Sequence, residues 1–133
     1  MVTTHSEAVT RGVKVSVKAH YSKEHSDPER PLCFFLYTIT IENQSNIEVQ
    51  LLNRHWEITD GNGAVEHVRG PGVVGKQPTL RPGESFEYTS GCPLTTEFGF
   101  MQGEFEMVCS ESGERFDANV AGFPLRKNQE SLN

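Results

Sequence analysis

The sequence predicts a single all-β domain, an antiparallel β-sandwich or barrel of about seven or eight strands. Apolar and polar residues alternate with a period of two along most of the chain. Turn signals rich in glycine, proline and asparagine separate these segments at intervals of about ten residues. Nowhere do apolar residues recur at i, i+3, i+4 and i+7 over three turns, so no long amphipathic helix is expected.

The amino-terminal half contains three strong strand signals. Val13 to Ala19 alternates as a half-buried strand, and the polar segment 20–31, which carries prolines, is expected to be a loop. Leu32 to Glu42 is rich in aromatic and β-branched residues and is expected to be a central strand. The next strand covers Val49 to Thr59 and ends at a strong turn signal, after which a short return strand completes a hairpin.

The carboxy-terminal half alternates in the same way. Strands are expected around Phe86 to Ser90, Met101 to Val108 and Arg115 to Phe123. Gly103 lies early in the second of these, which favours a bulge or a close approach by another chain. The ends lack periodicity, so residues 1–11 and 126–133 are expected to be flexible tails around a domain at 12–125.

Charge and cysteine content exclude several classes of protein. The chain of 133 residues has 12 Lys and Arg against 18 Asp and Glu, a net charge of −6, which disfavours binding to nucleic acid or anionic membranes. No apolar run is long enough to cross a membrane, and no basic start precedes an apolar stretch, so a cytoplasmic location is expected. Three cysteines without a CxxC spacing indicate reduced, buried thiols rather than disulfides or a zinc site.

The segment from Gly70 to Gly75 has the spacing G-x-G-x-x-G, which in dinucleotide-binding folds precedes a helix that binds pyrophosphate. Two β-branched valines and Pro78 leave no room for that helix, so a structural loop is favoured. A weaker anion site stays open, because backbone amides can bind phosphate without a helix. Its candidate residues, together with a nearby His67, are Arg54, Arg69, Gly70, Gly72, Gly75 and Lys76.

No catalytic constellation can be identified. The five histidines are expected to lie at the surface or to have hydrogen-bond partners, and the carboxylates alternate on strands as solvated residues. Cys92 follows Ser90-Gly91, a turn that could expose a thiol, but no histidine partner is apparent. We therefore expect a protein that is not an enzyme and has no cofactor and no metal.

A second candidate surface is a face for protein partners. Its residues are Trp56, Phe98, Phe100 and Met101. Trp56, the single tryptophan, is expected to anchor the core rather than to stand on a binding face. Exposed strand edges of a sandwich would also suit a partner's strand.

Several blocks of residues in one order resemble the ApaG family over about residues 12 to 125. The blocks are Arg54-x-Trp56-x-Ile58, Val68 to Gly75 followed by Gln77-Pro78, Pro82-Gly83, Tyr88-x-Ser90-Gly91-Cys92-Pro93-Leu94, Thr96, and Met101-x-Gly103-x-Phe105-x-Met107. The family often has a proline before its final Phe-x-Leu, where this chain has Ala121-Gly122 before Phe123-Pro124-Leu125.

The resemblance implies an immunoglobulin-like or fibronectin type III-like sandwich in a small cytoplasmic protein. Relatives are linked genetically to a diadenosine-tetraphosphate hydrolase and to cobalt and magnesium handling, and the domain occurs in eukaryotes in settings that suggest protein interaction. No catalytic residues are defined for the family, so none are carried over, while its glycine loop corresponds here to Gly70, Gly72 and Gly75.

Two hypotheses follow. The first is a non-enzymatic interaction or regulatory module with a protein partner, as a monomer or a homodimer. The second is a binder of a small pyrophosphate-containing or nucleotide ligand at the glycine-rich loop, with hydrolysis ranked last.

Overall fold

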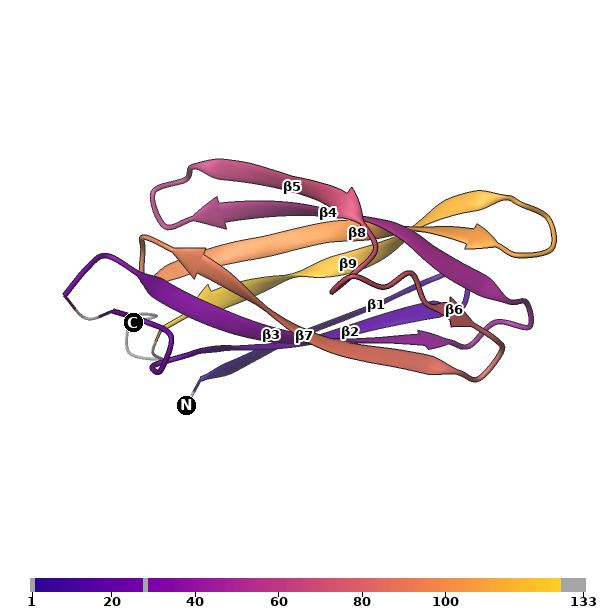
Figure 1. The fold of residues 1–133 in the computed structure, drawn as a ribbon. Coiled ribbons are helices and arrows are strands. Elements are labelled where there is room, and N and C mark those ends of the chain that lie inside the picture. Colours follow the sequence, from indigo (N-terminus) through magenta and orange to yellow (C-terminus); the bar gives the residue numbers. More distant parts are fainter. Residues whose placement is uncertain (1, 28, 128–133) are drawn as a thin grey trace.

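The computed structural model describes residues 2–27 and 29–127, which form two antiparallel sheets packed face to face (Figure 1). The four-stranded sheet has the order β1-β2-β3-β7, and the five-stranded sheet has the order β5-β4-β8-β9 with β6 paired to β4. The strands are β1 (Thr3–Thr10), β2 (Val13–Tyr21), β3 (Cys33–Asn43), β4 (Val49–Asp60), β5 (Val65–Pro71), β6 (Thr79–Leu80), β7 (Ser85–Leu94), β8 (Phe98–Cys109) and β9 (Arg115–Arg126). The predicted all-β sandwich is confirmed. No helix that could cross a bilayer occurs in residues 2–27 and 29–127.

The core lies between the sheets, where the alternating apolar residues meet. In β3, Phe35, Ile39 and Ile41 are fully buried, as the period-two pattern predicts. Trp56 of β4 is 3% exposed and packs edge-on against Tyr37, with the ring centroids 5.5 Å apart. The expectation that Trp56 anchors the core is confirmed.

The amino terminus corrects the prediction of a flexible tail over residues 1–11. Residues 3–10 form β1, which pairs with β2 along its whole length through a turn at Arg11-Gly12, where φ is 49° and 80°. β1 also lies beside β9, because Thr4 Oγ1 donates a hydrogen bond of 2.6 Å to the carbonyl of Pro124. β1 is largely polar and only Thr4 in it is buried, so no apolar alternation marks this strand in the sequence.

At the other end, the predicted tail over residues 126–133 begins inside a strand. β9 runs through Arg126, and the backbone N–H of Lys127 donates to the carbonyl of Glu97 at 2.9 Å. Residues 128–133 lie outside the described part of the chain. β1 and the two-residue β6 account for the difference between the nine strands of residues 2–27 and 29–127 and the seven or eight predicted.

One buried polar residue organises the loop between β3 and β4. Asn43 is fully buried, and its Nδ2 donates to the carbonyls of Ile47 and Leu80 at 2.7 and 2.9 Å. Its Oδ1 accepts hydrogen bonds from the backbone N–H and the hydroxyl of Ser45. Asn43 therefore ties this loop to β6 with every polar atom of its side chain in use.

The bulge predicted at Gly103 is confirmed. The β8–β9 pairing shifts register between Met101 and Gly103, which marks a bulge. A Cβ on Gly103 would lie only 2.0 Å from the carbonyl oxygen of His55 on β4. The two central strands of the five-stranded sheet can pair here only because glycine has no side chain.

Candidate functional site

The glycine-rich loop forms a tight turn after β5. Val73 N–H donates to the carbonyl of Lys76 at 2.8 Å, and Lys76 N–H returns a bond of 2.9 Å to the carbonyl of Val73. Gly72 has a φ of 61°, and a Cβ there would lie 2.3 Å from the Lys76 oxygen. The segment leads into β6 and not into a helix, so the loop lacks the helix N-terminus on which dinucleotide binding depends.

Arg54 of β4 holds this loop in place. Its Nη1 donates hydrogen bonds of 3.0 Å to the carbonyls of Pro71 and of Gly72. The guanidinium lies flat against Gly70, since a Cβ there would be 3.0 Å from the Cζ, Nη1 and Nη2 atoms of Arg54. Glycine is therefore required at both positions for structural reasons. Gly70 leaves room for the Arg54 guanidinium, and Gly72 adopts a left-handed backbone conformation.

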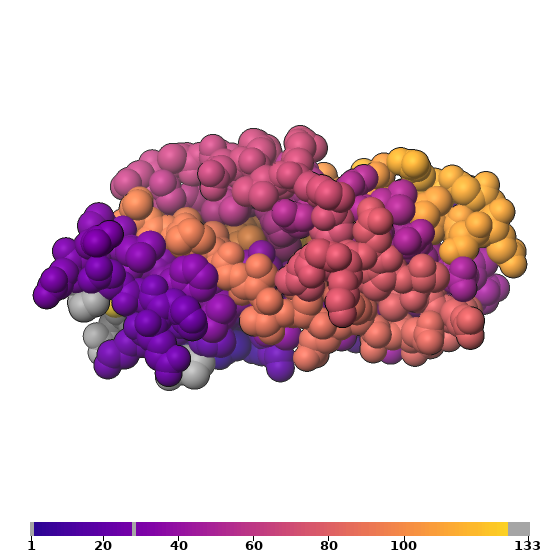
Figure 2. Space-filling model, viewed as in Figure 1, coloured from indigo at the N-terminus to yellow at the C-terminus, as the bar shows by residue number. Residues whose placement is uncertain are grey.

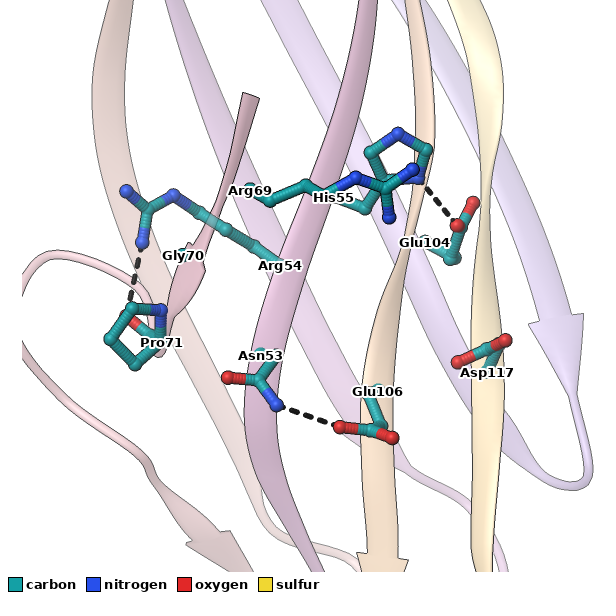
Figure 3. Close-up of a pocket in the computed structure, with 9 residues that line it drawn as sticks. All are labelled: Asn53, Arg54, His55, Arg69, Gly70, Pro71, Glu104, Glu106 and Asp117. Atoms are coloured by element: carbon teal, nitrogen blue, oxygen red, sulfur yellow. Dashed lines mark hydrogen bonds and ion pairs between the residues drawn. The ribbon is translucent and has the colours of Figure 1, made fainter. Parts of the chain in front are cut away.

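The structure separates the basic residues that the sequence suggested would cluster at this loop. Arg54 and Arg69 extend in opposite directions from β4 and β5, with Arg69 reaching toward His55 and Glu104 (Figure 3). Lys76 is exposed on the turn itself. Arg54 and Arg69 thus line one hollow with Gly70 but direct their guanidinium groups apart, and Lys76 is not among its lining residues, so the expected cluster forms only in part, while anion binding by the loop stays a prediction.

Arg69 borders a hollow of about 460 Å³ on the outer face of the five-stranded sheet (Figure 3). Its lining is mixed in charge and largely paired internally. Asn53 Nδ2 donates to Glu106 at 2.7 Å, and Arg115 lies 3.7 Å from the same carboxylate. Among the described residues, no group of three or more His, Cys, Asp or Glu side chains could hold a metal ion.

A hydrogen-bonded chain of Glu104, His55 and His67 lies at the edge of this hollow. His55 Nδ1 is 2.6 Å from Glu104 Oε1, and His55 Nε2 is 3.0 Å from His67 Nδ1, with the two rings stacked. An ionised carboxylate only accepts, so Nδ1 of His55 carries the proton. In the neutral pair His67 Nδ1 then donates to His55 Nε2, and the Nε2 lone pair of His67 is left free. The expectation of hydrogen-bonded histidines is confirmed for His55 and His67.

A second hollow, of about 230 Å³, opens between the two sheets on the side where β5 and β7 form their margins. The segment after β5, coloured rose, lies at the surface on this side (Figures 1 and 2). The hollow lies beneath the glycine-rich turn and is lined by Tyr37, Arg54, Trp56, Val73, Val74, Gly75, Tyr88 and Ser90. Three of its lining residues, Val73 to Gly75, belong to the glycine-rich motif. The sequence around that motif does not show that residues of β3 and β7 complete the hollow.

Burial controls the titratable groups around this hollow. Burial raises the pKa of the Tyr37 and Tyr88 hydroxyls above their ordinary values. In a neighbouring hollow, burial and the nearby carboxylate of Glu66 raise the pKa of Cys92 to about 11. Cys92 lies inside β7 and is 3% exposed, so the suggestion of a thiol presented by a turn is wrong.

The structure divides the predicted interaction face into two buried and two exposed residues. Trp56 and Met101 are 3% and 1% exposed, so both belong to the core and the prediction that they line a surface is wrong. Phe98 and Phe100 are 51% and 39% exposed on the outer face of β8. Alternation explains the division, because residues two apart on a strand share a face, so Phe98 and Phe100 point outward while Met101, the next residue after Phe100, points into the core.

Residues of the neighbouring strands continue the surface of the two phenylalanines in a row across the sheet. Phe100 pairs with Thr59 of β4 and with Pro124 of β9, and Thr59 also pairs with Val65 of β5. Val65 is 52% exposed. Directly paired residues share one face of a sheet, so these side chains form a continuous surface at one end of it.

Comparison with known proteins agrees with these features. The ApaG domain family matches residues 23–109 of this chain. Protein ApaG of Brucella anthropi is 52% identical over 118 residues, 89% of this chain and 90% of the relative, and Protein ApaG of Beijerinckia indica is 50% identical over 117 residues, 88% and 89%. The crystal structure of the ApaA protein from Bordetella pertussis superposes with a TM-score of 0.84 at 47% identity, and the match covers 88% of this chain and 94% of that one. The chain therefore belongs to the ApaG family.

Proposed function

We propose that this ApaG-family protein is a non-enzymatic interaction module of the cytoplasm, which binds a protein partner through Phe98 and Phe100. The single observation that carries the proposal is the exposure of both aromatic side chains on one face of a central strand. Exposed aromatic residues on a rigid scaffold are typical anchors of protein interfaces.

The surroundings of the two phenylalanines have the composition of an interface. Val65 extends the apolar surface across β5, while the ion pair between Lys127 and Glu97, 3.5 Å long, contributes charge close to Phe98. An apolar centre with a polar rim is the usual arrangement of a protein interface.

The chemistry of the remaining groups supports a role other than catalysis. The Cys92 thiol is buried and its raised pKa disfavours the reactive thiolate. His55 already shares its two ring nitrogens with Glu104 and His67. These groups are engaged in the structure of the sheet rather than presented together to a substrate.

The test places a photoreactive phenylalanine analogue at position 98 in cells, with the same analogue at the exposed Lys18 on the opposite sheet as a control. We expect a discrete cross-linked product from position 98, lost when Phe100→Asp is added, and no such product from position 18. A hot-spot aromatic contributes about 2 kcal/mol or more, so Phe100→Asp should weaken the complex at least tenfold. The same products from both positions, or a product from position 98 that survives Phe100→Asp, would refute the proposal.

A second candidate function is binding of a small pyrophosphate-containing or nucleotide ligand at the glycine-rich turn. The observation in its favour is that the backbone N–H groups of Val74 and Gly75 have no hydrogen-bond partner among the described residues, beside the exposed Lys76. Amide NMR during a pyrophosphate titration tests it, since saturable shifts confined to residues 72–76 are expected. The link of relatives to cobalt and magnesium handling stays a prediction for this chain.

A further inference from the structure

The hollow between the sheets brings together polar groups from three strands and one turn. Arg54 and Trp56 come from β4, Tyr37 from β3 and Tyr88 from β7, with the turn at 73–75 as the cover. The rings of Tyr37, Trp56 and Tyr88 form part of its walls, and a polar contact made beside them is shielded from water and strengthened.

Two hydrogen-bond donors in these walls lack partners. The side chains of Trp56 and Tyr88 are more than nine-tenths buried, with exposures of 3% and 7%. Trp56 Nε1 and the Tyr88 hydroxyl form no hydrogen bond within the described part of the chain. Burial of an unsatisfied donor is unfavourable, and native structures rarely retain two in one place without a use.

Arg54 contributes a cation to the same place. Its Nη1 is occupied by the two loop carbonyls, but none of the ion pairs among the described residues involves Arg54. Glu66 lines the neighbouring hollow, which Arg54 also borders. One guanidinium with a carboxylate in the vicinity favours a ligand with a single negative charge over a dianion such as phosphate.

We propose that this hollow binds a monocarboxylate group, held by the Arg54 guanidinium and by hydrogen bonds from Trp56 Nε1–H and the Tyr88 hydroxyl. A carboxylate is flat, carries one negative charge and accepts at two oxygens, which matches one cation and two unpartnered donors between aromatic walls. The site is separate from the Phe98 and Phe100 surface and does not depend on the proposed function.

The turn over the hollow has the properties of a movable cover. Val74 is 54% exposed and has a φ of 44°, in the left-handed region that a β-branched residue rarely adopts. Such strain is typical of ligand clamps and switch segments. Because Trp56 Nε1 and the Tyr88 hydroxyl are buried, a ligand reaches them when this turn moves aside.

The chain supplies its own probe, since Trp56 is the single tryptophan and its Nε1–H resonance in a ¹H–¹⁵N spectrum is unique. The labelled protein is titrated with sodium acetate and, as a neutral control of the same shape, with acetamide at matched ionic strength. A second arm compares a tripeptide with a free carboxy terminus with its amidated form. We expect saturable movement of the Trp56 Nε1–H signal with acetate or with the free tripeptide, and none with acetamide or the amidated tripeptide. The arm with the tighter binding identifies a small free acid or a peptide carboxy terminus as the source of the carboxylate.

Two variants separate binding from folding. Tyr88→Phe removes one unpartnered hydroxyl, so we expect it to leave the thermal midpoint unchanged or higher and to weaken acetate binding at least fivefold. Arg54→Met should abolish the shift, while Arg115→Met, which removes an exposed charge on β9, should leave it unchanged. An unmoved Trp56 signal with both carboxylate probes, equal shifts with acetamide, a shift produced by pyrophosphate alone, or a marked loss of stability in Tyr88→Phe would overturn the proposal.

Discussion

Replacement of Gly103 by alanine tests the packing of the two central strands of the five-stranded sheet. A Cβ at position 103 would lie 2.0 Å from the carbonyl oxygen of His55 and 3.2 Å from Cα of Trp56. Carbon-to-oxygen contacts between strands lie near 3.3–3.6 Å, so the strands would have to separate by roughly 1.3 Å. Both partners are backbone, so no side-chain rotation relieves the clash.

The expected loss of stability follows from two opposing terms. Overpacking of this kind costs about 3 kcal/mol, toward the upper end of the usual range. Alanine also reduces the freedom of the unfolded chain, which returns about 0.4–1 kcal/mol. Gly103→Ala should therefore lower the free energy of unfolding by about 2–3 kcal/mol.

Gly122→Ala is the matched control. A Cβ at Gly122 would lie 2.2 Å from Cζ of Phe100, a clash of similar depth. Phe100 is 39% exposed, so its ring can swing into solvent. We expect a change within about 1 kcal/mol in either direction.

Urea unfolding followed by fluorescence of the single, buried tryptophan measures both variants. With an m-value of about 1–3 kcal/mol/M, Gly103→Ala should move the unfolding midpoint by about 1–2 M to lower urea. Equal midpoints for the two variants would show that the strands near Gly103 yield as easily as a surface ring, and the reasoning from backbone contact would fail.

Two further predictions concern buried polar groups. Asn43→Ala removes the side-chain donor of the Leu80 carbonyl and one of the two side-chain donors of the Ile47 carbonyl, so urea unfolding should show a loss of about 2 kcal/mol, and a loss below 1 kcal/mol would contradict the role assigned to Asn43. The pKa of Cys92 is about 11 in the folded protein against an ordinary value of 9.0, so its contribution to stability is intact below pH 9 and is lost as pH rises toward 11. The raised pKa values of Tyr37 and Tyr88 act in the same direction above pH 10, so Cys92→Ala should reduce the fall in stability between pH 9 and 10 most clearly; an unchanged fall there would refute the assignment to Cys92.

Most of the fold could be predicted because most strands carry an apolar-polar alternation in their own sequence. Alternation placed β2, β3, β4, β8 and β9, and Gly103 marked a real bulge in β8. β1 escaped prediction because its residues are largely polar and only Thr4 is buried, so no apolar alternation marks the strand in the sequence. Asn43 escaped for a related reason, since an asparagine near a turn signal does not reveal that it is fully buried.

The candidate sites were less predictable than the strands. The sequence drew attention to the segment around Arg54 and to Phe98 and Phe100, and their role as sites stays a prediction. It grouped Arg54 with Arg69, and Phe100 with Met101, because residues close in sequence or on paired strands look like neighbours. Register pairs Arg54 with Gly70 and Arg69 with His55, so the two arginines point apart, and alternation along β8 puts Met101 on the opposite face from Phe100.

The sequence by itself determined the all-β class, the family and the position of the glycine-rich turn, since these follow from local periodicity, turn chemistry and motif spacing. The tertiary structure alone decided that Arg54 binds the carbonyls of that turn, that Trp56 and Tyr88 leave polar atoms unpartnered beneath it, and that Phe98 and Phe100 face outward. The physical reason is that each of these depends on which strands lie side by side and on what covers them. Only long-range strand pairing determines which strands are neighbours and which face of each is covered. A period-two pattern shows that a strand has two faces but does not show what lies beside or above it.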